Sequence, residues 1–372
     1  MAISDEDRQF LARAFELARR GEGFVEPNPL VGCVVIQGGQ VVGEGWHRRF
    51  GGPHAEIEAL AAAGDAARGA TACVSLEPCC HQGKTPPCVG ALLAARVARV
   101  VVGAEDPNPV VSGKGIAALR AAGIAVDLAD DCDEAAALVA PFRKLITTGR
   151  PWMIAKWAMT LDGKIAAIDG SSQWITGPEA RAAVHALRGR VDAIVVGRGT
   201  VERDDPLLTA RPAGARTATR IVLDAGANLP LTSKLARTAG EAPVLVAAAS
   251  DAPAERVAAL RSRRIEVLLL PGADRGARLE TLLNELGRRQ TTNVLVEGGS
   301  AVLGSLLACG AIDEVFAFVA PKLLGGAAAP GPVGGPGLAT IAHAVPLKRL
   351  ELSCLGPDLL LRGHVAPGVC AR

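Results

Sequence analysis

The segment SLEPCCHQGKTPPC (residues 75–88) constrains this chain more than any other part of its sequence. It holds three cysteines and a histidine, and the triplet His54-Ala55-Glu56 stands upstream. A metal site, a disulfide-closed loop and a cysteine-rich turn without a ligand are the alternatives. The chain has nine cysteines, an odd number, scattered over 372 residues without a signal-peptide pattern. Disulfides are therefore not expected, and metal or core cysteines are the better interpretations.

Charge and composition narrow the class of protein. Lys and Arg number 40 against 38 Asp and Glu, and aromatic residues make up 3% without a single Tyr. The near-equal charges predict no basic surface for nucleic acid or for an anionic membrane. The few aromatic residues predict no surface on which bases could stack. The longest uncharged stretch, residues 323–347, is too rich in Gly and Pro for a membrane helix. The sequence therefore predicts a cytoplasmic enzyme.

The first part of the chain alternates between helix and strand patterns. An amphipathic helix is expected first, then a hairpin around Gly38-Gly39, and then helices that alternate with short apolar strands. The expected helices are 5–20, 53–64, 86–97 and 113–122, and the expected strands are 32–46 (the hairpin), 69–76, 97–106 and 124–129. The pattern predicts a three-layer α/β domain.

A helix over residues 133–146 leads into the sequence TTGRP, where we place a domain boundary. The predicted domains are residues 1–147 and residues 148–372. The pattern of buried strands then starts again and predicts a second α/β domain with a mixed sheet. A strand and loop are expected at 152–166 and a helix at 178–188. Buried strands, each followed by helix or turn signals, are expected at 192–201, 219–225, 242–250, 265–272 and 292–299, and late strands at 314–324 and 350–363.

The histidine and two of the cysteines suit a catalytic zinc. One imidazole and two thiolates, from His54, Cys79 and Cys88, leave a tetrahedral zinc with an open position for water. Glu56 is then a carboxylate that is not a ligand and can move protons. His-X-Glu followed by Pro-Cys-X-X-Cys is the signature of zinc deaminases. Here Gln82 stands where the second cysteine is expected, and Cys88 follows after an inserted loop.

Prolines before both ligand segments predict that the ligands lie at helix N-termini, where the helix dipole favours a thiolate. We place Pro53 at the first helical position, and Pro86-Pro87 opens the helix of Cys88. Cys80, adjacent to a ligand, is expected to point away from the metal. A structural zinc or a turn without function is the alternative, but a structural zinc needs no proton shuttle beside it.

Four segments resemble the deaminase half of the bifunctional deaminase–reductase family of riboflavin biosynthesis: residues 27–35, 43–60, 75–88 and 105–115. The resemblance implies a cytidine-deaminase-like fold and a pyrimidine substrate with a ribosylamino 5-phosphate arm. It implies substrate contacts from Asn28, His47, His81, Lys84, Asp106 and Asn108. By residue type alone, the sequences PNP and DPNP are also ordinary turns. Cys80 departs from the family, which commonly has a small hydroxyl residue there.

In the second half, glycine turns at 197–199 and 298–299 lie between a strand and a helix, which suits a cofactor diphosphate, although no GxGxxG fingerprint is present. Residues 156–166, 172–177, 191–211, 293–299 and 319–326 resemble the reductase half of the same family, which implies a dihydrofolate-reductase-like fold and NADPH. The implied NADPH contacts are Ala158, Trp174, Thr200, Asp204, Gly299, Ser300, Ala301, Val302, Leu303, Gly304 and Ser305. The implied substrate contacts are Ser172, Arg188, Leu208, Arg211 and Glu297. Where the family often has a serine near the cofactor, this chain has Ala225.

The expected chemistry is hydrolytic deamination of the pyrimidine, followed by hydride transfer to the first carbon of its opened sugar. Asp204 and Glu297 are both candidates for assisting protonation of the imine. The alternatives are a deaminase of another nucleotide or of a nucleic-acid base with a C-terminal binding module, and a zinc-stabilised scaffold without enzymatic activity. The sequence leaves the oligomeric state open, and a homo-oligomer is compatible with it.

Overall fold

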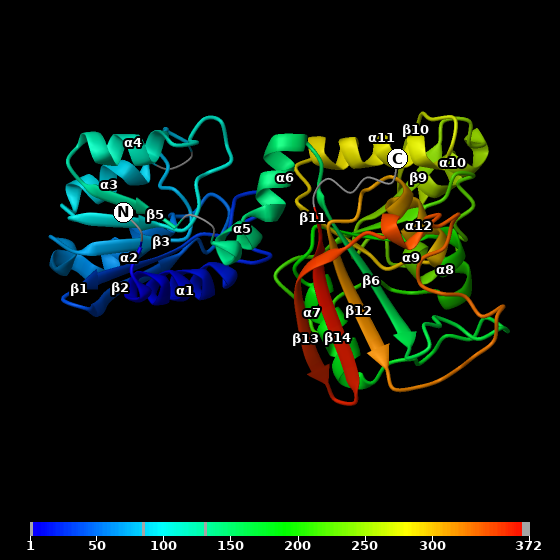
Figure 1. Ribbon diagram of the computed structural model, residues 1–372. Helices are drawn as coiled ribbons and strands as arrows, with labels where there is room; N and C mark the ends of the chain where they lie inside the picture. The colour runs from blue at the N-terminus through cyan, green and yellow to red at the C-terminus, as the bar shows by residue number, and fades with distance from the viewer. Residues whose placement is uncertain (1–2, 84–85, 130–131, 367–372) are drawn as a thin grey trace. The chain divides into compact units, whose positions relative to one another are not determined.

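The computed structural model divides the chain into two compact units, Met1–Gly149 and Arg150–Arg372, and each holds a sheet flanked by helices (Figure 1). The division follows α6 (Ala140–Thr148), whose C-cap Gly149 has a φ of 67°, a left-handed conformation that costs glycine little. The sequence pattern placed the boundary after residue 147. The structure describes residues 3–83, 86–129 and 132–366.

The sheet of the first unit has the strand order β2-β1-β3-β4-β5. The hairpin strands β2 and β1 are antiparallel, β1 is antiparallel to β3, and β3, β4 and β5 run parallel. The bounds are β1 (Gly32–Gln37), β2 (Gln40–Trp46), β3 (Thr71–Val74), β4 (Arg99–Val102) and β5 (Ala125–Leu128).

Helices cover both faces of this sheet, because its strands are apolar on both sides. Val34 and Val101 pack with α1 on one face, and Val35 and Val100 pack under α2, α3 and α4 on the other (Figure 1). The expected three-layer α/β architecture is therefore confirmed. The helices are α1 (Asp5–Arg19), α2 (Ala55–Ala63), η1 (Gly64–Ala67), α3 (Cys88–Ala94), α4 (Lys114–Ala121), α5 (Asp133–Leu138) and α6.

The second unit has one mixed sheet with the order β10-β9-β8-β7-β11-β6-β12-β14-β13. The strands from β10 to β12 run parallel, whereas β14 pairs antiparallel with both β12 and β13. The bounds are β6 (Trp152–Thr160), β7 (Ala193–Gly197), β8 (Thr219–Leu223), β9 (Val244–Ala249), β10 (Glu266–Leu270), β11 (Asn293–Val296), β12 (Glu314–Ala320), β13 (Leu347–Leu355) and β14 (Asp358–Val365).

Two apolar cores lie on opposite faces of this sheet. One contains Leu187, Leu235 and Leu260 from α7, α9 and α10, and the other contains Leu282 and Leu303 from α11 and α12. Parallel strands buried on both faces explain the nearly continuous apolar runs in the sequence. The helices are α7 (Pro178–Arg188), α8 (Arg198–Asp204), α9 (Lys234–Arg237), α10 (Ala254–Ser262), α11 (Arg275–Arg288), α12 (Ser300–Ala308) and η2 (Ile341–His343).

Two predicted helix details are wrong. The helix expected over residues 133–146 is two helices, α5 and α6, with Pro141 in the first turn of α6. Proline has no backbone N–H and its ring collides with the preceding turn, so it kinks or breaks a helix interior but is tolerated in the first turn. Pro53 does not open α2 either, since the helix begins at Ala55 with His54 as its N-cap.

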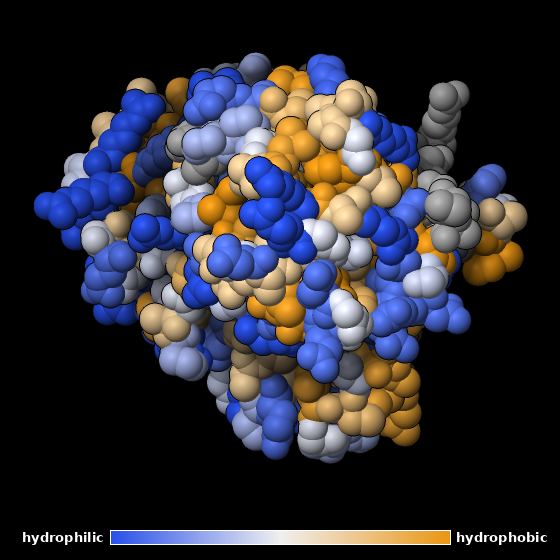
Figure 2. All heavy atoms as spheres, turned by 90° about the vertical axis from the view of Figure 1, so that its left-hand side faces the viewer, coloured by the Kyte–Doolittle hydropathy of each residue, from blue (hydrophilic) through white to orange (hydrophobic). Residues whose placement is uncertain are grey.

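The surface carries both polar and apolar side chains, and the face shown in Figure 2 has hydrophilic residues interspersed with apolar ones. Among the described residues, no helix has the length and apolar character that crossing a membrane requires.

Candidate active sites

The structure brings the three predicted zinc ligands together in the first unit. His54 is the N-cap of α2, Cys88 is the first residue of α3, and Cys79 lies in the loop after β3. The Nδ1 atom of His54 lies 3.2 Å from Sγ of Cys88 and 3.5 Å from Sγ of Cys79. All three donor atoms lie within 4.8 Å of one another. Cys80 is outside this group and packs against the apolar core around α2.

The donor set fits zinc. Two thiol sulfurs and one imidazole nitrogen are ligands that zinc prefers, and three protein ligands leave one tetrahedral position open. The backbone N–H of Cys88 donates to Sγ of Cys79 over 3.3 Å. Hydrogen bonds from Cys88 and His54 outweigh burial and lower the pKa of the Cys79 thiol to about 4. The same contact with Cys79, together with burial, raises the pKa of the Cys88 thiol. The pair thus favours one thiolate, on Cys79, and a thiolate is the form that binds metal.

Glu56 is a buried carboxyl beside this group. It is the second residue of α2 and only 3% exposed. Burial raises the pKa of Glu56 to about 7, although the nearby His54 acts in the opposite direction. A carboxyl with such a pKa can both take up and release a proton near neutral pH.

Asn28 and His47 lie side by side, next to the predicted zinc ligand His54. Nδ2 of Asn28 lies 3.2 Å from Nε2 of His47, and Nδ1 of His47 lies 2.9 Å from the carbonyl oxygen of Pro53. A single proton on Nδ1 satisfies both contacts, since Asn28 then donates to Nε2. Burial lowers the pKa of His47, which keeps the ring neutral. The ring also meets His54 edge to face at 5.4 Å between centroids.

Glu77, which sequence reasoning missed, connects the ligand loop to the segment after β4. Its buried carboxylate accepts hydrogen bonds from the backbone N–H groups of Asp106 (3.2 Å), Gly113 (2.9 Å) and Ile116 (3.0 Å). Its position two residues before Cys79 could have drawn attention to it. Its hydrogen-bond partners, 29 to 39 residues further along the chain, could not be inferred from the sequence. Burial raises the pKa of Asp106 to about 6.

Asn108, His81 and Lys84 are the remaining predicted substrate residues of this unit. Asn108 donates its backbone N–H to Oδ1 of Asp106 over 2.8 Å and its side-chain oxygen accepts from Val110, so DPNP is also a turn. His81 is exposed, and Lys84 lies outside the described residues. Asn108 and Asp106 are thus fixed by the turn, whereas His81 is accessible to a ligand.

In the second unit, Glu297 is the centre of a buried ion-pair group. Its side chain is 6% exposed and accepts from Arg188, Nε to Oε1 at 2.5 Å and Nη2 to Oε2 at 2.8 Å. Lys156 lies 3.4 Å from Oε2 and was not among the predicted residues. Burial alone would raise the pKa of Glu297, but Arg188 and Lys156 lower it to about 2. Glu297 therefore stays ionised at neutral pH and is a poor proton donor.

Arg211 joins the same region through His185 and Thr209. Nδ1 of His185 lies 3.1 Å from the carbonyl oxygen of Thr209, and Nη2 of Arg211 lies 3.4 Å from Nε2 of His185. Ser172 donates to Oδ1 of Asp204 over 3.4 Å. Leu208 is buried with a φ of 54°. Arg188 donates to the carbonyl oxygen of Thr209 over 3.5 Å and Arg211 to its hydroxyl over 3.3 Å, so the two arginines meet at this residue.

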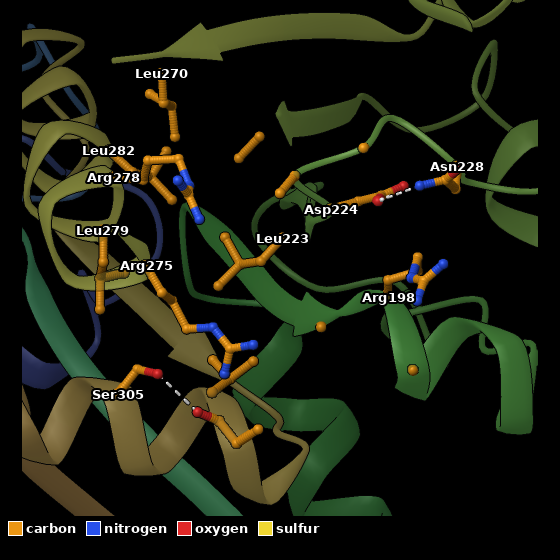
Figure 3. A pocket seen from close by; sticks show the side chains of 17 residues that line it. Arg198, Leu223, Asp224, Asn228, Leu270, Arg275, Arg278, Leu279, Leu282 and Ser305 are labelled. Atoms are coloured by element: carbon orange, nitrogen blue, oxygen red, sulfur yellow. Dashed lines mark hydrogen bonds between the residues drawn. The ribbon is translucent and has the colours of Figure 1, made fainter. Parts of the chain in front are cut away.

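The two glycine turns lie side by side, since the N–H of Gly197 donates to the carbonyl oxygen of Gly298 over 3.0 Å. Gly197 and Gly199 of the first turn line a cavity of about 420 Å³ (Figure 3), whereas Gly298 and Gly299 are not among its lining residues. Of the predicted cofactor residues, Ala301, Val302 and Ser305 line this cavity. Ala158, Trp174, Thr200 and Asp204 do not, and Trp174 is 66% exposed with Arg181 4.8 Å above its ring.

Comparison with known proteins identifies the family. The family model described as RibD C-terminal domain matches residues 151–361, and the cytidine and deoxycytidylate deaminase zinc-binding region matches residues 4–104. Riboflavin biosynthesis protein RibD of Actinobacillus pleuropneumoniae is 42% identical over 95% of this chain and 94% of its own. The chain belongs to the RibD family.

Solved RibD structures agree with the fold of both units. RibD of Acinetobacter baumannii, form 1, superimposes with a TM-score of 0.83 at 38% identity, covering 97% of this chain and 99% of the other. A deaminase/reductase from Thermotoga maritima gives 0.82 at 36%, with the same coverage. The resemblance seen in the sequence is therefore confirmed: the chain is a bifunctional deaminase and reductase of riboflavin biosynthesis that uses zinc and NADPH.

Proposed function

We propose that this enzyme deaminates 2,5-diamino-6-(5-phosphoribosylamino)pyrimidin-4-one and then reduces the ribosyl group of the product to a ribityl chain. The observation that carries the proposal is the group of His54, Cys79 and Cys88 beside the buried Glu56. The Thermotoga maritima relative is described as a diaminohydroxyphosphoribosylaminopyrimidine deaminase and 5-amino-6-(5-phosphoribosylamino)uracil reductase. Residues 1–147 carry the first step, and residues 148–372 carry the second.

In the first unit, a bound zinc would act as a Lewis acid and would lower the pKa of a water molecule toward neutrality. His54, Cys79 and Cys88 hold the metal. Glu56 takes a proton at its carboxylate and returns it to the leaving amine, which its pKa of about 7 permits. Neutral His47 orients Asn28 toward the pyrimidine, because the two side chains are hydrogen-bonded.

The remaining residues of this site bind the rest of the substrate. Asp106, held by Glu77, and Asn108 complete the pocket around the ring and ribose. His81 and Lys84 stand in the inserted loop and bind the phosphate arm, since both side chains can carry positive charge. Glu77 is a positioning residue, because its carboxylate connects the ligand loop to the Asp106 segment.

In the second unit, NADPH supplies the hydride. Residues 299–305, Thr200, Ala158, Trp174 and Asp204 would hold the cofactor. Arg188, Arg211, Ser172 and Leu208 hold the substrate. Because Glu297 already accepts from the Nε and Nη2 fork of Arg188, Arg211 is the arginine whose forked hydrogen bonds suit the phosphate. Ionised Glu297 fixes Arg188 and Lys156 in place. Of the two candidates for imine protonation, Asp204 is therefore favoured over Glu297.

The substrate is a small phosphorylated pyrimidine and not a nucleic acid, which the near-equal numbers of basic and acidic residues favour. We extend the proposal to a cytoplasmic location, because thiolate ligands persist in a reducing compartment.

Incubation of the full-length zinc enzyme with the diaminopyrimidine ribosyl phosphate, with and without NADPH, tests the proposal. Mass spectrometry should show loss of ammonia in both samples, and gain of a hydride and a proton only with NADPH. Deamination of cytidine, deoxycytidylate or single-stranded DNA, in place of this compound, would show that the substrate assignment is wrong.

A further inference from the structure

The cavity of the second unit lies where the parallel strands β7, β8, β9 and β10 end, between α11 and α12. Ligands of open α/β sheets bind at this carboxyl edge. The cavity joins the stretch that would hold the cofactor, because Ala301, Val302 and Ser305 of α12 form one of its walls. Its size of about 420 Å³ suits part of a dinucleotide.

Two arginines of α11 give this cavity a positive side. Figure 3 shows Arg275 and Arg278 extending from α11 toward the middle of the cavity. Nη1 of Arg278 donates to the carbonyl oxygen of Gly272 over 3.1 Å. No carboxylate in the described part of the chain forms an ion pair with Arg275 or Arg278, whereas Arg198, across the cavity, pairs with Glu202 at 3.3 Å. Arg275 and Arg278 thus have charge available for an anion.

The opposite wall offers a hydrogen-bond acceptor. Asp224 is 4% exposed, and Figure 3 shows it beside Asn228 on the far side from α11. Its Oδ1 accepts from Nδ2 of Asn228 over 3.5 Å, but its buried Oδ2 has no hydrogen-bond partner in the described part of the chain. A buried acceptor without a partner costs free energy unless a donor reaches it, and a ribose hydroxyl or an adenine amino group is such a donor.

Apolar side chains form the rest of the lining. They come from the ends of β8, β9 and β10 and from α11, and they are Leu223, Ala247, Leu270, Leu279 and Leu282. An aromatic ring can lie on this surface, with a phosphate at the arginines and a sugar hydroxyl at Asp224. Adenosine with a phosphate on its ribose carries all three of these groups.

We infer that Arg275 and Arg278 bind the ribose 2′-phosphate that distinguishes NADPH from NADH, and so determine the choice of cofactor. The inference rests on the proposed function, in that NADPH serves the second unit. Residues 299–305 hold the diphosphate, and the adenosine end enters the cavity. Arg275 and Arg278 contact no reacting atom, so they change cofactor affinity and leave the chemistry of hydride transfer alone.

The full-length variants Arg275→Ala, Arg278→Ala and their combination test this inference. Each single change should raise KM for NADPH about tenfold, the size of one charge-assisted hydrogen bond, with kcat retained and KM for NADH unchanged. The control is Arg288→Ala, at the opposite end of the same helix, whose side chain is 74% exposed. It removes the same charge and should change neither constant.

Titration with adenosine 2′-phosphate and adenosine 5′-phosphate provides a readout that needs no turnover. Wild type and Arg288→Ala should bind the 2′-phosphate more tightly, and the double variant should lose that preference. Equal loss of NADPH and NADH affinity, or an unchanged preference, would overturn the assignment. If the wild type reduces nothing with NADPH, the proposed function fails, and the two adenosine phosphates still decide whether the arginines recognise the 2′-phosphate.

Discussion

The two sites of this enzyme are built in opposite ways. In the first unit, three donor atoms lie within 4.8 Å of one another, at the starts of α2 and α3 and in the loop after β3, and Glu56 is buried beside them. In the second unit, Glu297 gathers Lys156 from β6 and Arg188 from α7, which are 141 and 109 residues away in the sequence.

This difference reflects what each reaction needs from the protein. A zinc deaminase site needs few ligands and a proton carrier in fixed geometry, and short local motifs supply both. A reductase site binds two large molecules, so its charges and its cavity spread along the ends of several strands. Replacing one zinc ligand is therefore expected to abolish the activity of the first site. Replacing one residue of the second site is expected to lower its activity only in part.

The largest expected effect is loss of the metal. Cys88→Ala removes one of three ligands, so the zinc content should fall to near zero. Deamination should then fall by more than the roughly 10²–10⁴-fold that acid–base catalysis alone supplies. Cys80→Ala is the matched control and should retain both metal and activity. Metal analysis of the two purified variants decides the ligand assignment, which is wrong if Cys80→Ala loses the zinc and Cys88→Ala keeps it.

Glu56→Gln should have the next largest effect. The amide keeps the volume of the side chain and leaves the ligands in place, but it cannot carry protons. Deamination should therefore fall by about 10²–10⁴-fold while the zinc content stays at the wild-type level. Rate measurements alongside metal analysis check both halves of this expectation, and a variant of nearly full activity would exclude Glu56 as the proton carrier.

The ion-pair group predicts a pH dependence of stability in the second unit. Arg188 and Lys156 lower the folded-state pKa of Glu297 from its ordinary 4.5 to about 2. Its contribution is present above the ordinary value and is lost as pH falls toward 2. A depression of that size corresponds to about 3 kcal/mol. Urea unfolding of wild type and Glu297→Gln between neutral pH and pH 3 should show that the variant loses less stability on acidification.

Glu285→Gln is the control for this measurement, since Glu285 also has a lowered pKa but pairs at the surface with Arg288. Added salt should weaken the contribution of Glu285 and leave that of Glu297 nearly unchanged. Identical slopes for wild type and Glu297→Gln would show that the buried group contributes nothing.

The smallest effect is expected at Glu77. Glu77→Gln replaces a carboxylate that accepts three backbone N–H groups with an amide that has one acceptor oxygen. We expect a loss of about 1–3 kcal/mol in the stability of the first unit, with zinc retained and KM for the pyrimidine raised. An unchanged KM would show that Glu77 does not position the Asp106 segment.

The difference between local motifs and long-range contacts also decides which features could be predicted from the sequence. The grouping of His54, Cys79 and Cys88 was predictable because these residues stand in short motifs, and His54 and Cys88 also lie at helix starts. Lys156 was not, because nothing near it in the sequence marks its pairing with Glu297 across the sheet. The alternation of helix and strand patterns gave both α/β units, whereas the break between α5 and α6 depended on Pro141, a single residue inside an otherwise helical pattern.

The central claim is that one chain carries two independent sites that act in succession. The most direct measurement supplies the already deaminated ribosyl compound with NADPH to full-length Glu56→Gln, and the starting diaminopyrimidine to full-length Arg211→Ala. We expect the first variant to reduce at the wild-type rate and the second to accumulate the deaminated ribosyl compound. The two variants mixed should convert the diaminopyrimidine to the ribityl product. Loss of reduction in Glu56→Gln with the pre-deaminated compound would contradict the two-site account.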